Sequence, residues 1–305
     1  MLSYAVRRLL GAIPTLLVIL TITFFLVRLA PGGPFDGERS LPAEIERNLA
    51  AAYHLDEPLP MQYLRYLGQV VQGDFGPSFK YKDFSVTQLI WSGFPVSLQL
   101  GGTAMLLAVV VGTALGAFAA LRQNSGLDHA VMGTAMFGIA VPNFVIAPLL
   151  TLVLGVHLGL LPTGGWGTWQ QMLLPVVALA LPQIAYIARM TRASMIELLR
   201  SNFIRTARAK GLPERVTILR HALKGALLPV VSYLGPATAA VITGSVVIEQ
   251  IFGIPGIGRY FVQGALNRDY TLVMGVVIFY GVLIILFNLI VDLAYGLLDP
   301  RVRYD

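Results

Sequence analysis

The chain has 305 residues, of which 56% are hydrophobic and only 12% are charged, and its mean hydropathy is +0.71. This composition lies outside the range of soluble globular domains and is typical of an integral membrane protein. Cysteine is absent, which excludes disulfides and thiol chemistry within this chain.

Six apolar stretches have about the length that a helix needs to cross a bilayer, which is roughly 17 to 25 residues. The fourth of them begins near Met172, because the preceding segment PTGGWGTWQQ combines turn formers with two tryptophans that are typical of a membrane interface. The six stretches cover residues 9–27, 94–121, 130–156, 172–188, 225–248 and 270–291.

This pattern predicts an all-α integral membrane protein with six transmembrane helices. An external helical insert is expected between the first and second helices, and a cytoplasmic loop between the fourth and fifth. Residues 1–30 would form the N-terminus and first helix, residues 31–97 the external segment, and residues 98–305 the transmembrane core that contains the loop 189–224.

Lys and Arg are divided unequally between the two sides of the membrane. Of the 22 basic residues, fourteen lie on the side of the two termini and eight on the opposite side. Because cytoplasmic loops carry an excess of Lys and Arg, both termini are expected in the cytoplasm of a multi-pass protein of the cell membrane.

Residues 31–97 form the largest predicted external segment. The apolar spacing in LPAEIERNLAAAYHL and in PMQYLRYLGQVVQG predicts two short amphipathic helices, the second with Met61, Leu64, Leu67 and Val71 on one face. The pattern fits a segment that rests on the membrane surface, and it fits equally a platform that receives an extracytoplasmic partner.

The loop 189–224 carries nine Lys or Arg and two acidic residues. Good helix formers in SMIELLRSNFIRTARAK predict a helix, and Gly211 stands where a left-handed C-terminal cap is expected. Pro213 and Glu214 suit the first turn of a second helix that runs into the next span. The loop is therefore predicted to form a corner between two helices.

Two functions fit such a corner. A positively charged loop can contact anionic lipid headgroups. A helix below the membrane can instead dock a cytosolic partner, and the small side chains of Thr206, Ala207 and Ala209 favour docking because they permit close approach of the backbone.

Residues 205–211, RTARAKG, resemble the EAA loop of permease subunits of binding-protein-dependent ABC importers, in the form typical of the dipeptide and oligopeptide branch. Arg205 and Thr206 stand where that loop has Glu and Ala, and LLP at 227–229 comes several residues late. Four further stretches resemble this branch in the same order along the chain: RRLLGAIPTLLVILTITFFLVRLAPGGP, DEPLPMQYLRYLGQVVQGDFGPSF, EQIFGIPGIGRYFVQGALNRDYTLVMG and LLDPRVRY.

The resemblance implies a coupling helix that sits on a cytosolic ATPase. It further implies an importer with a second permease subunit, two ATPase subunits and an external substrate-binding protein, embedded in membrane lipid and without nucleic acid. This chain has no G-x-x-x-x-G-K-[ST] phosphate loop, so it is expected to be non-catalytic and to bind no cofactor, with ATP and Mg on the partner ATPases. The implied coupling residues are Arg205, Thr206, Ala207, Arg208, Ala209, Lys210 and Gly211.

The fifth span contains small and hydroxylated residues in PATAAVITGSVVI. Such residues permit tight helix packing, and they could also line a narrow polar path for the substrate. Thr238, Thr243 and Ser245 are the candidates for that path.

No enzymatic or metal site is expected from the sequence. The four histidines fall in four different predicted loops without ligand spacing, and no nucleophile elbow or pair of intramembrane carboxylates is present.

The sequence thus favours the channel subunit of an ABC importer that carries short peptides. The resemblance leaves nickel chelates or glutathione as alternative substrates within the same architecture, because it implies that a separate binding protein largely selects the substrate. An ion-coupled secondary transporter would need buried charges or unwound ion-binding segments, of which the sequence presents no convincing set. A scaffold without transport would leave the helical corner unexplained.

Overall fold

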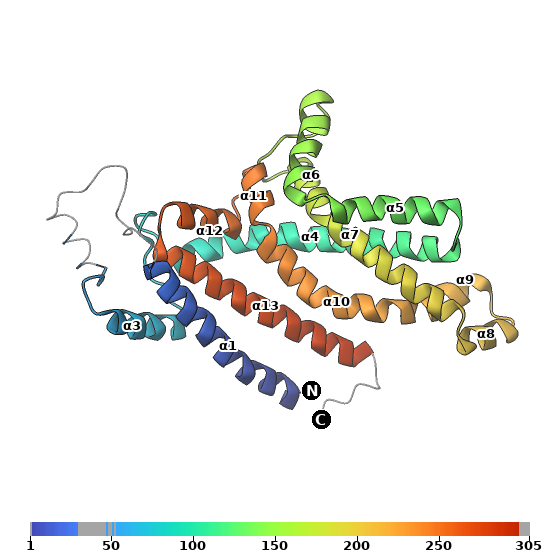
Figure 1. Ribbon diagram of the computed structural model, residues 1–305, viewed down its shortest axis with the longest axis horizontal. Helices are drawn as coiled ribbons and strands as arrows, with labels where there is room; N and C mark the ends of the chain where they lie inside the picture. Colours follow the sequence, from blue (N-terminus) through green and yellow to red (C-terminus); the bar gives the residue numbers. More distant parts are fainter. Residues whose placement is uncertain (1, 30–46, 48–50, 52, 299–305) are drawn as a thin grey trace. The chain divides into compact units, whose positions relative to one another are not determined.

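The computed structural model describes residues 2–29, 47, 51 and 53–298, and these residues are almost wholly helical (Figure 1). Two of the helical segments are π-helical turns, η1 and η2. The elements are α1 (Leu2–Leu29), α3 (Leu59–Val71), α4 (Val86–Leu121), α5 (Gly126–Ala140), α6 (Asn143–Leu150), η1 (Thr151–His157), α7 (Trp169–Leu199), α8 (Asn202–Ala209), α9 (Glu214–Val216), η2 (Thr217–Ala222), α10 (Leu223–Gly244), α11 (Val246–Phe252), α12 (Ile257–Leu266) and α13 (Tyr270–Leu298).

Within the described part of the chain, five helical stretches are long and apolar enough to cross a membrane, and a sixth span is possible if one bent helix pair is counted. This confirms the predicted all-α membrane fold. The third predicted span, residues 130–156, is not one straight helix, because α5 and the α6–η1 segment meet at 104°. The break falls at Val141 and Pro142, where Val141 is extended with φ −95° and ψ 122°, the conformation that a following proline favours.

Contacts divide the chain into two compact units. The larger unit comprises residues 1–6, 97–254 and 284–305, and the smaller unit comprises residues 7–96 and 255–283. The sequence-based partition placed residues 255–283 in the transmembrane core, whereas the contacts group them with the first helix and the external segment.

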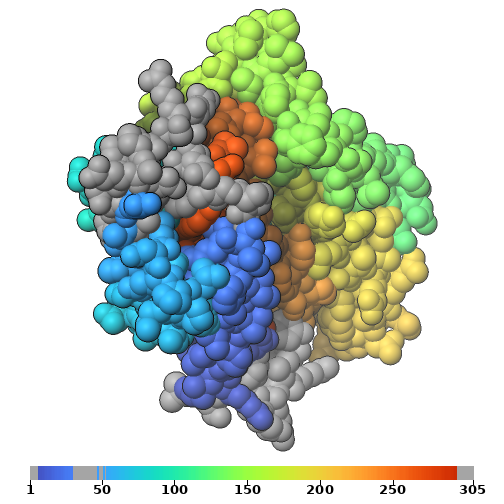
Figure 2. Space-filling view, turned by 60° about the vertical axis from the view of Figure 1, so that its left-hand side comes forward, coloured from blue at the N-terminus to red at the C-terminus, as the bar shows by residue number. Residues whose placement is uncertain are grey.

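In the smaller unit, the described part of residues 31–97, the segment predicted to be external, packs on α1 and on the start of α13. Phe24 of α1 is fully buried and shares a cluster with Tyr66 of α3 and Met274 of α13. Figure 2 shows α3, in light blue, against α1, in darker blue. The second predicted external helix, residues 60–73, is therefore confirmed as α3, while the first predicted helix, residues 41–55, lies largely outside the described residues.

The start of α13 holds the loop before α4 through one buried carboxylate. Asp269 is fully buried and accepts hydrogen bonds from the Ser78 hydroxyl and from the Phe79 amide, the latter at 3.1 Å. Its other oxygen accepts from the Leu272 amide at 3.1 Å. One side chain thus caps α13 and fixes the chain reversal that precedes α4.

In the larger unit, two glycines let α4 approach α7 closely. A Cβ atom on Gly112 would lie 2.8 Å from the Ile184 carbonyl oxygen, and a Cβ atom on Gly116 would overlap the Ala188 carbonyl oxygen. These residues form a G-x-x-x-G motif, whose small side chains suit tight packing of membrane helices. The close crossing positions α7, which leads directly into the basic loop.

Candidate functional site

The basic loop contains the predicted corner at Gly211, but the single helix predicted over residues 194–210 is divided: α7 ends at Leu199 and α8 begins at Asn202. Helix α8 ends at Ala209, and Gly211 adopts the left-handed conformation with φ +77°. The Leu212 amide donates to the Ala207 carbonyl at 3.3 Å, which closes the helix end. Gly211 thus has the predicted left-handed conformation, whereas Pro213 is the N-cap of α9 and precedes the first turn in which the sequence placed it.

The second helix of the corner differs from the prediction of one regular helix. After the three residues of α9, the chain forms the π-helical turn η2 and only then enters α10. The wider turn places Thr217 and Ala222 in buried positions. Turns of this kind are found frequently at functional sites.

The inner face of α8 packs against its own chain. Ile204 is fully buried and Ala207 is 7% exposed, and Ile204 belongs to a cluster with Met195 of α7 and Ala226 of α10. The small side chain of Ala207 therefore allows α8 to approach this chain's own helices. The expectation that Ala207 itself faces a partner does not fit this position.

The outer face of α8 consists of Asn202, Arg205, Thr206 and Ala209, all exposed. Two small side chains, Thr206 and Ala209, lie in its middle, one turn apart. The exposed ring of Phe203 and the exposed Lys210 flank this face. Sequence analysis missed Phe203, although an aromatic residue among charges on a short helix was a signal that could have identified it.

Arg208 bridges the corner. Its guanidinium donates two hydrogen bonds to the Glu214 carboxylate, at 2.6 and 3.1 Å, and this pairing raises the pKa of Arg208. Both side chains are largely exposed, so the pair contributes little to stability. Arg208 is thus bound within the loop and ties the end of α8 to the start of α9.

An ion pair between a buried carboxylate and a partly exposed guanidinium joins α5 to α7. The Arg192 guanidinium donates to both carboxylate oxygens of Asp128, each at 2.6 Å. Asp128 is 1% exposed and also accepts from the Asn124 amide at 2.9 Å. A second link runs from Arg200 to the side chain of Gln123 at 3.0 Å. These contacts hold the preceding loop and the base of the corner together.

The three candidates for the substrate path occupy different environments. Thr238 and Thr243 are partly exposed, and the Thr243 hydroxyl donates to the Ala239 carbonyl of its own helix at 2.8 Å. Ser245 is fully buried, so in this conformation it lines no path. It stands between the last residue of α10 and the first residue of α11.

Ser245 belongs to a buried polar cluster that sequence analysis did not anticipate. The carboxylate of Glu249, fully buried, accepts hydrogen bonds from the hydroxyls of Ser245 at 2.6 Å and Ser97 at 2.7 Å. The spacing of Ser245 and Glu249, four residues apart on a helix, was a detectable signal. Ser97 could not be added from the sequence, because it lies 152 residues away.

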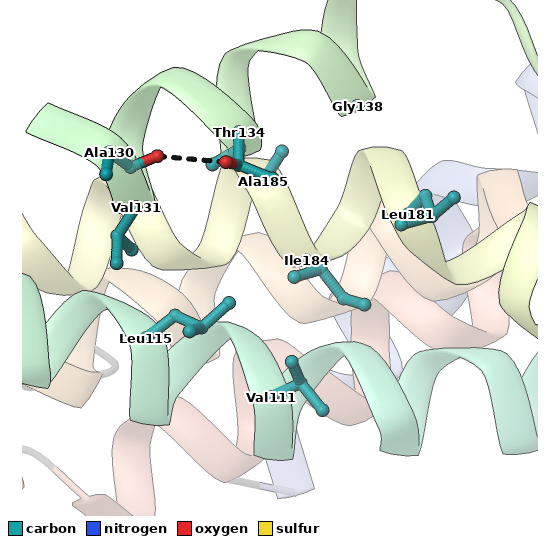
Figure 3. Close-up of a pocket in the computed structure, with 10 residues that line it drawn as sticks. Val111, Leu115, Ala130, Val131, Thr134, Gly138, Leu181, Ile184 and Ala185 are labelled. Atoms are coloured by element: carbon teal, nitrogen blue, oxygen red, sulfur yellow. Dashed lines mark hydrogen bonds between the residues drawn. The ribbon is translucent and has the colours of Figure 1, made fainter.

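A pocket of about 360 Å³ opens between α4, α5 and α7 in the larger unit. Figure 3 shows that its lining is aliphatic except for Thr134, whose hydroxyl donates to the Ala130 carbonyl at 2.9 Å. A peptide backbone would leave its polar groups without partners against such a surface. The lining suits hydrocarbon rather than a peptide.

The long apolar helices define a multi-pass integral membrane protein, and comparisons of the sequence identify its family. Residues 112–304 match the family described as the binding-protein-dependent transport system inner membrane component, and residues 1–101 match the N-terminal part described for the same systems. The chain therefore belongs to the family of inner-membrane components of binding-protein-dependent transport systems.

Individual relatives resemble the chain over its full length. It is 59% identical to the oligopeptide transport system permease protein OppB of Escherichia coli strain K12, with 100% of both chains covered. It is 48% identical to the dipeptide transport system permease protein DppB of Bacillus subtilis, over 99% of this chain and 98% of the relative.

The fold resembles that of a solved transporter. A chain of the MetNI methionine ABC transporter, in an inward-facing conformation, matches 69% of this chain with a TM-score of 0.57, and 96% of that chain is covered. The two sequences are 17% identical, so this likeness concerns the fold.

Proposed function

We propose that the chain is the membrane channel subunit of an ABC importer that carries short peptides into the cell. The full-length identity of 59% to an oligopeptide permease supports the peptide substrate over nickel chelates or glutathione. The importer would contain a second permease subunit, two cytosolic ATPase subunits that bind ATP and Mg, and an external binding protein. Both termini would lie in the cytoplasm.

The outer face of α8 is proposed as the contact for one ATPase. The observation that supports this most directly is the placement of Thr206 and Ala209 on the exposed face of a helix whose opposite face is anchored by Ile204 and Ala207. Small outward side chains permit close approach of a partner, and an anchored helix transmits force. The residues in the proposed contact are Arg205, Thr206, Ala209 and Lys210, with Gly211 setting the angle of the corner.

ATP binding would close the two ATPases, and the docked corner would move with them. Because α8 packs against α7 and α10, its displacement would carry these helices between inward-open and outward-open arrangements, as in other rigid-body switches. Ala207 would act inside the loop by seating α8, whereas Arg208, whose exposed pair with Glu214 contributes little to stability, would be dispensable for coupling.

The test compares variants of the outer face in the complete transporter, reconstituted with its ATPases and binding protein. Ala209→Trp should abolish ATP-driven uptake of a labelled short peptide or release the ATPase, because the ring holds the surfaces apart. Ala209→Ser and Arg208→Gln should retain uptake. If Ala209→Trp is active while Arg208→Gln is not, the loop acts through its charge on lipid and the docking proposal is wrong.

A further inference from the structure

Helix α3 has a feature that a soluble external helix would not have, since it is apolar on two opposite faces. Its 13 residues, LPMQYLRYLGQVV, contain one charged residue, Arg65. The inner face packs on α1 and α13 through Tyr63, Tyr66 and Val70. A helix with one solvated face would carry polar residues opposite to that packed face.

The opposite face of α3 is apolar and exposed. Met61 is 55% exposed, Leu64 is 60% exposed and Val71 is 79% exposed. On a helical projection these residues lie together with Pro60 and Gly68, and they share a surface of about 100° or more. Arg65 lies at the edge of this surface, where its guanidinium pairs with Glu57 at 2.6 Å.

Contacts with α1 fix the depth of α3. The Tyr63 hydroxyl lies 2.7 Å from the Thr21 hydroxyl, and the side chain of Gln62 accepts from Arg28 at 2.9 Å. Arg28 follows the apolar run of α1, and Thr21 lies seven residues earlier, which is about 10 Å along the helix axis. Helices that lie in a membrane interface bury their apolar face by about 5 to 10 Å.

The exposed face of α3 also continues the lipid-facing surface of α1. Phe25 of α1 is 36% exposed and stacks on Tyr63 with ring centroids 6.0 Å apart. Beside it, Ile22 and Leu26 are 53% and 64% exposed on a helix long and apolar enough to span the bilayer. In Figure 2 the surfaces of α3 and α1 adjoin each other.

We propose that α3 lies within the bilayer at the surface where α1 ends, with Met61, Leu64 and Val71 inserted among the lipid acyl chains. The partner of this face is the membrane lipid itself. Helix α3 then packs on the C-terminal third of α1 and places the loop that Asp269 binds at the level of the lipid headgroups. Hydrophobic contact drives the insertion, because nothing on this face of α3 is charged.

The natural absence of cysteine allows single spin labels without background. Met61→Cys and Leu64→Cys carry a nitroxide on the exposed face of α3. Leu26→Cys on α1 is the lipid reference, and Lys82→Cys, exposed in the external loop, is the water reference. The complete transporter is reconstituted in vesicles of phosphatidylethanolamine and phosphatidylglycerol, and collisions of each label with oxygen and with a water-soluble nickel chelate are measured.

We expect the labels at 61 and 64 to behave as the label at 26 does, with frequent oxygen collisions and several-fold fewer nickel collisions than at 82. Addition of the external binding protein should leave both values unchanged. Nickel access equal to that at 82 would overturn the proposal, as would protection that appears only with the binding protein. Exclusion of both oxygen and nickel would also overturn it, because the face would then be covered by another subunit.

Discussion

At the scale of single residues, the basic corner depends on a few groups whose replacement has distinct consequences. Gly211 is required for its backbone conformation, since a Cβ atom there would meet nothing within 4 Å. Asp128 is required for its charge, since it neutralises the Arg192 guanidinium of α7, the helix that precedes the corner. The two residues can be tested separately because one acts through strain and the other through electrostatics.

Gly211→Val should strain the corner by about 1 to 2 kcal/mol, because its φ of +77° lies in the left-handed region that β-branched residues avoid. The expected result is a weaker ATPase association, measured by co-purification, together with reduced uptake. Gly211→Asn is the matched control, since asparagine tolerates this conformation and should retain both. Equal loss of ATPase association and uptake in the two variants would show that backbone strain at position 211 is not the cause.

Asp128→Asn should lower the free energy of unfolding by about 3 kcal/mol, because Arg192 would keep its charge and lose its buried partner. Thermal unfolding of the purified transporter in detergent measures the effect. Replacing both residues, as Asp128→Leu with Arg192→Met, should restore much of the stability. A single variant as stable as the parent would contradict the structural importance of this pair.

At the scale of elements, the crossing of α4 and α7 is set by glycines rather than by large apolar residues. Gly112 and Gly116 face the backbone of α7 directly, whereas Gly102 on the same helix has nothing within 4 Å of a built Cβ atom. In α4, close packing against α7 therefore requires glycine at position 116 but not at position 102.

Gly116→Ala should destabilise the protein by about 1 to 3 kcal/mol, because the added methyl group must push α4 away from the Ala188 carbonyl. Gly102→Ala should be neutral or stabilising by up to about 1 kcal/mol, since alanine restricts the unfolded chain and fits a helix better. Denaturation curves of the two variants in the same detergent provide the comparison. A stable Gly116→Ala variant would contradict the close crossing.

At the scale of the whole molecule, the division of basic residues predicts the orientation in the membrane. A reporter fused after Asp305 should be cytoplasmic, and a cysteine at Lys82 should react with a membrane-impermeant maleimide added outside intact cells. A reporter near Ser40 should also be external, although that position lies outside the described residues. If the terminal reporter and the site at 82 were found on one side, the six-span topology would be wrong.

The external segment contributes to the smaller unit as well as to any partner contact. Because α3 buries Tyr66 against Phe24 and Met274, replacing residues 41–72 with a flexible linker would uncover apolar surface in addition to removing a platform. Loss of uptake in that variant would therefore not distinguish a loss of stability from the loss of a partner contact. A single substitution outside this packed cluster, such as Lys82→Ala in the exposed loop, removes no packing and separates the two effects.

The sequence alone determined the membrane fold, the positions of the apolar spans and the corner at Gly211 and Pro213. These properties are local, since hydropathy over a window and the backbone preferences of glycine and proline do not depend on distant residues. Hydropathy could not reveal the 104° break after α5, because the apolar run continues through it.

Only the tertiary structure decided which side of α8 is available to a partner. Ala207 and Ala209 are two residues apart and chemically identical, yet the first is buried and the second is exposed, because packing against α7 and α10 fixes the rotation of a short helix. The same holds for polar pairs such as Asp128 with Arg192, which lie 64 residues apart. Such contacts arise from the placement of whole helices, and no local pattern in the sequence encodes that placement.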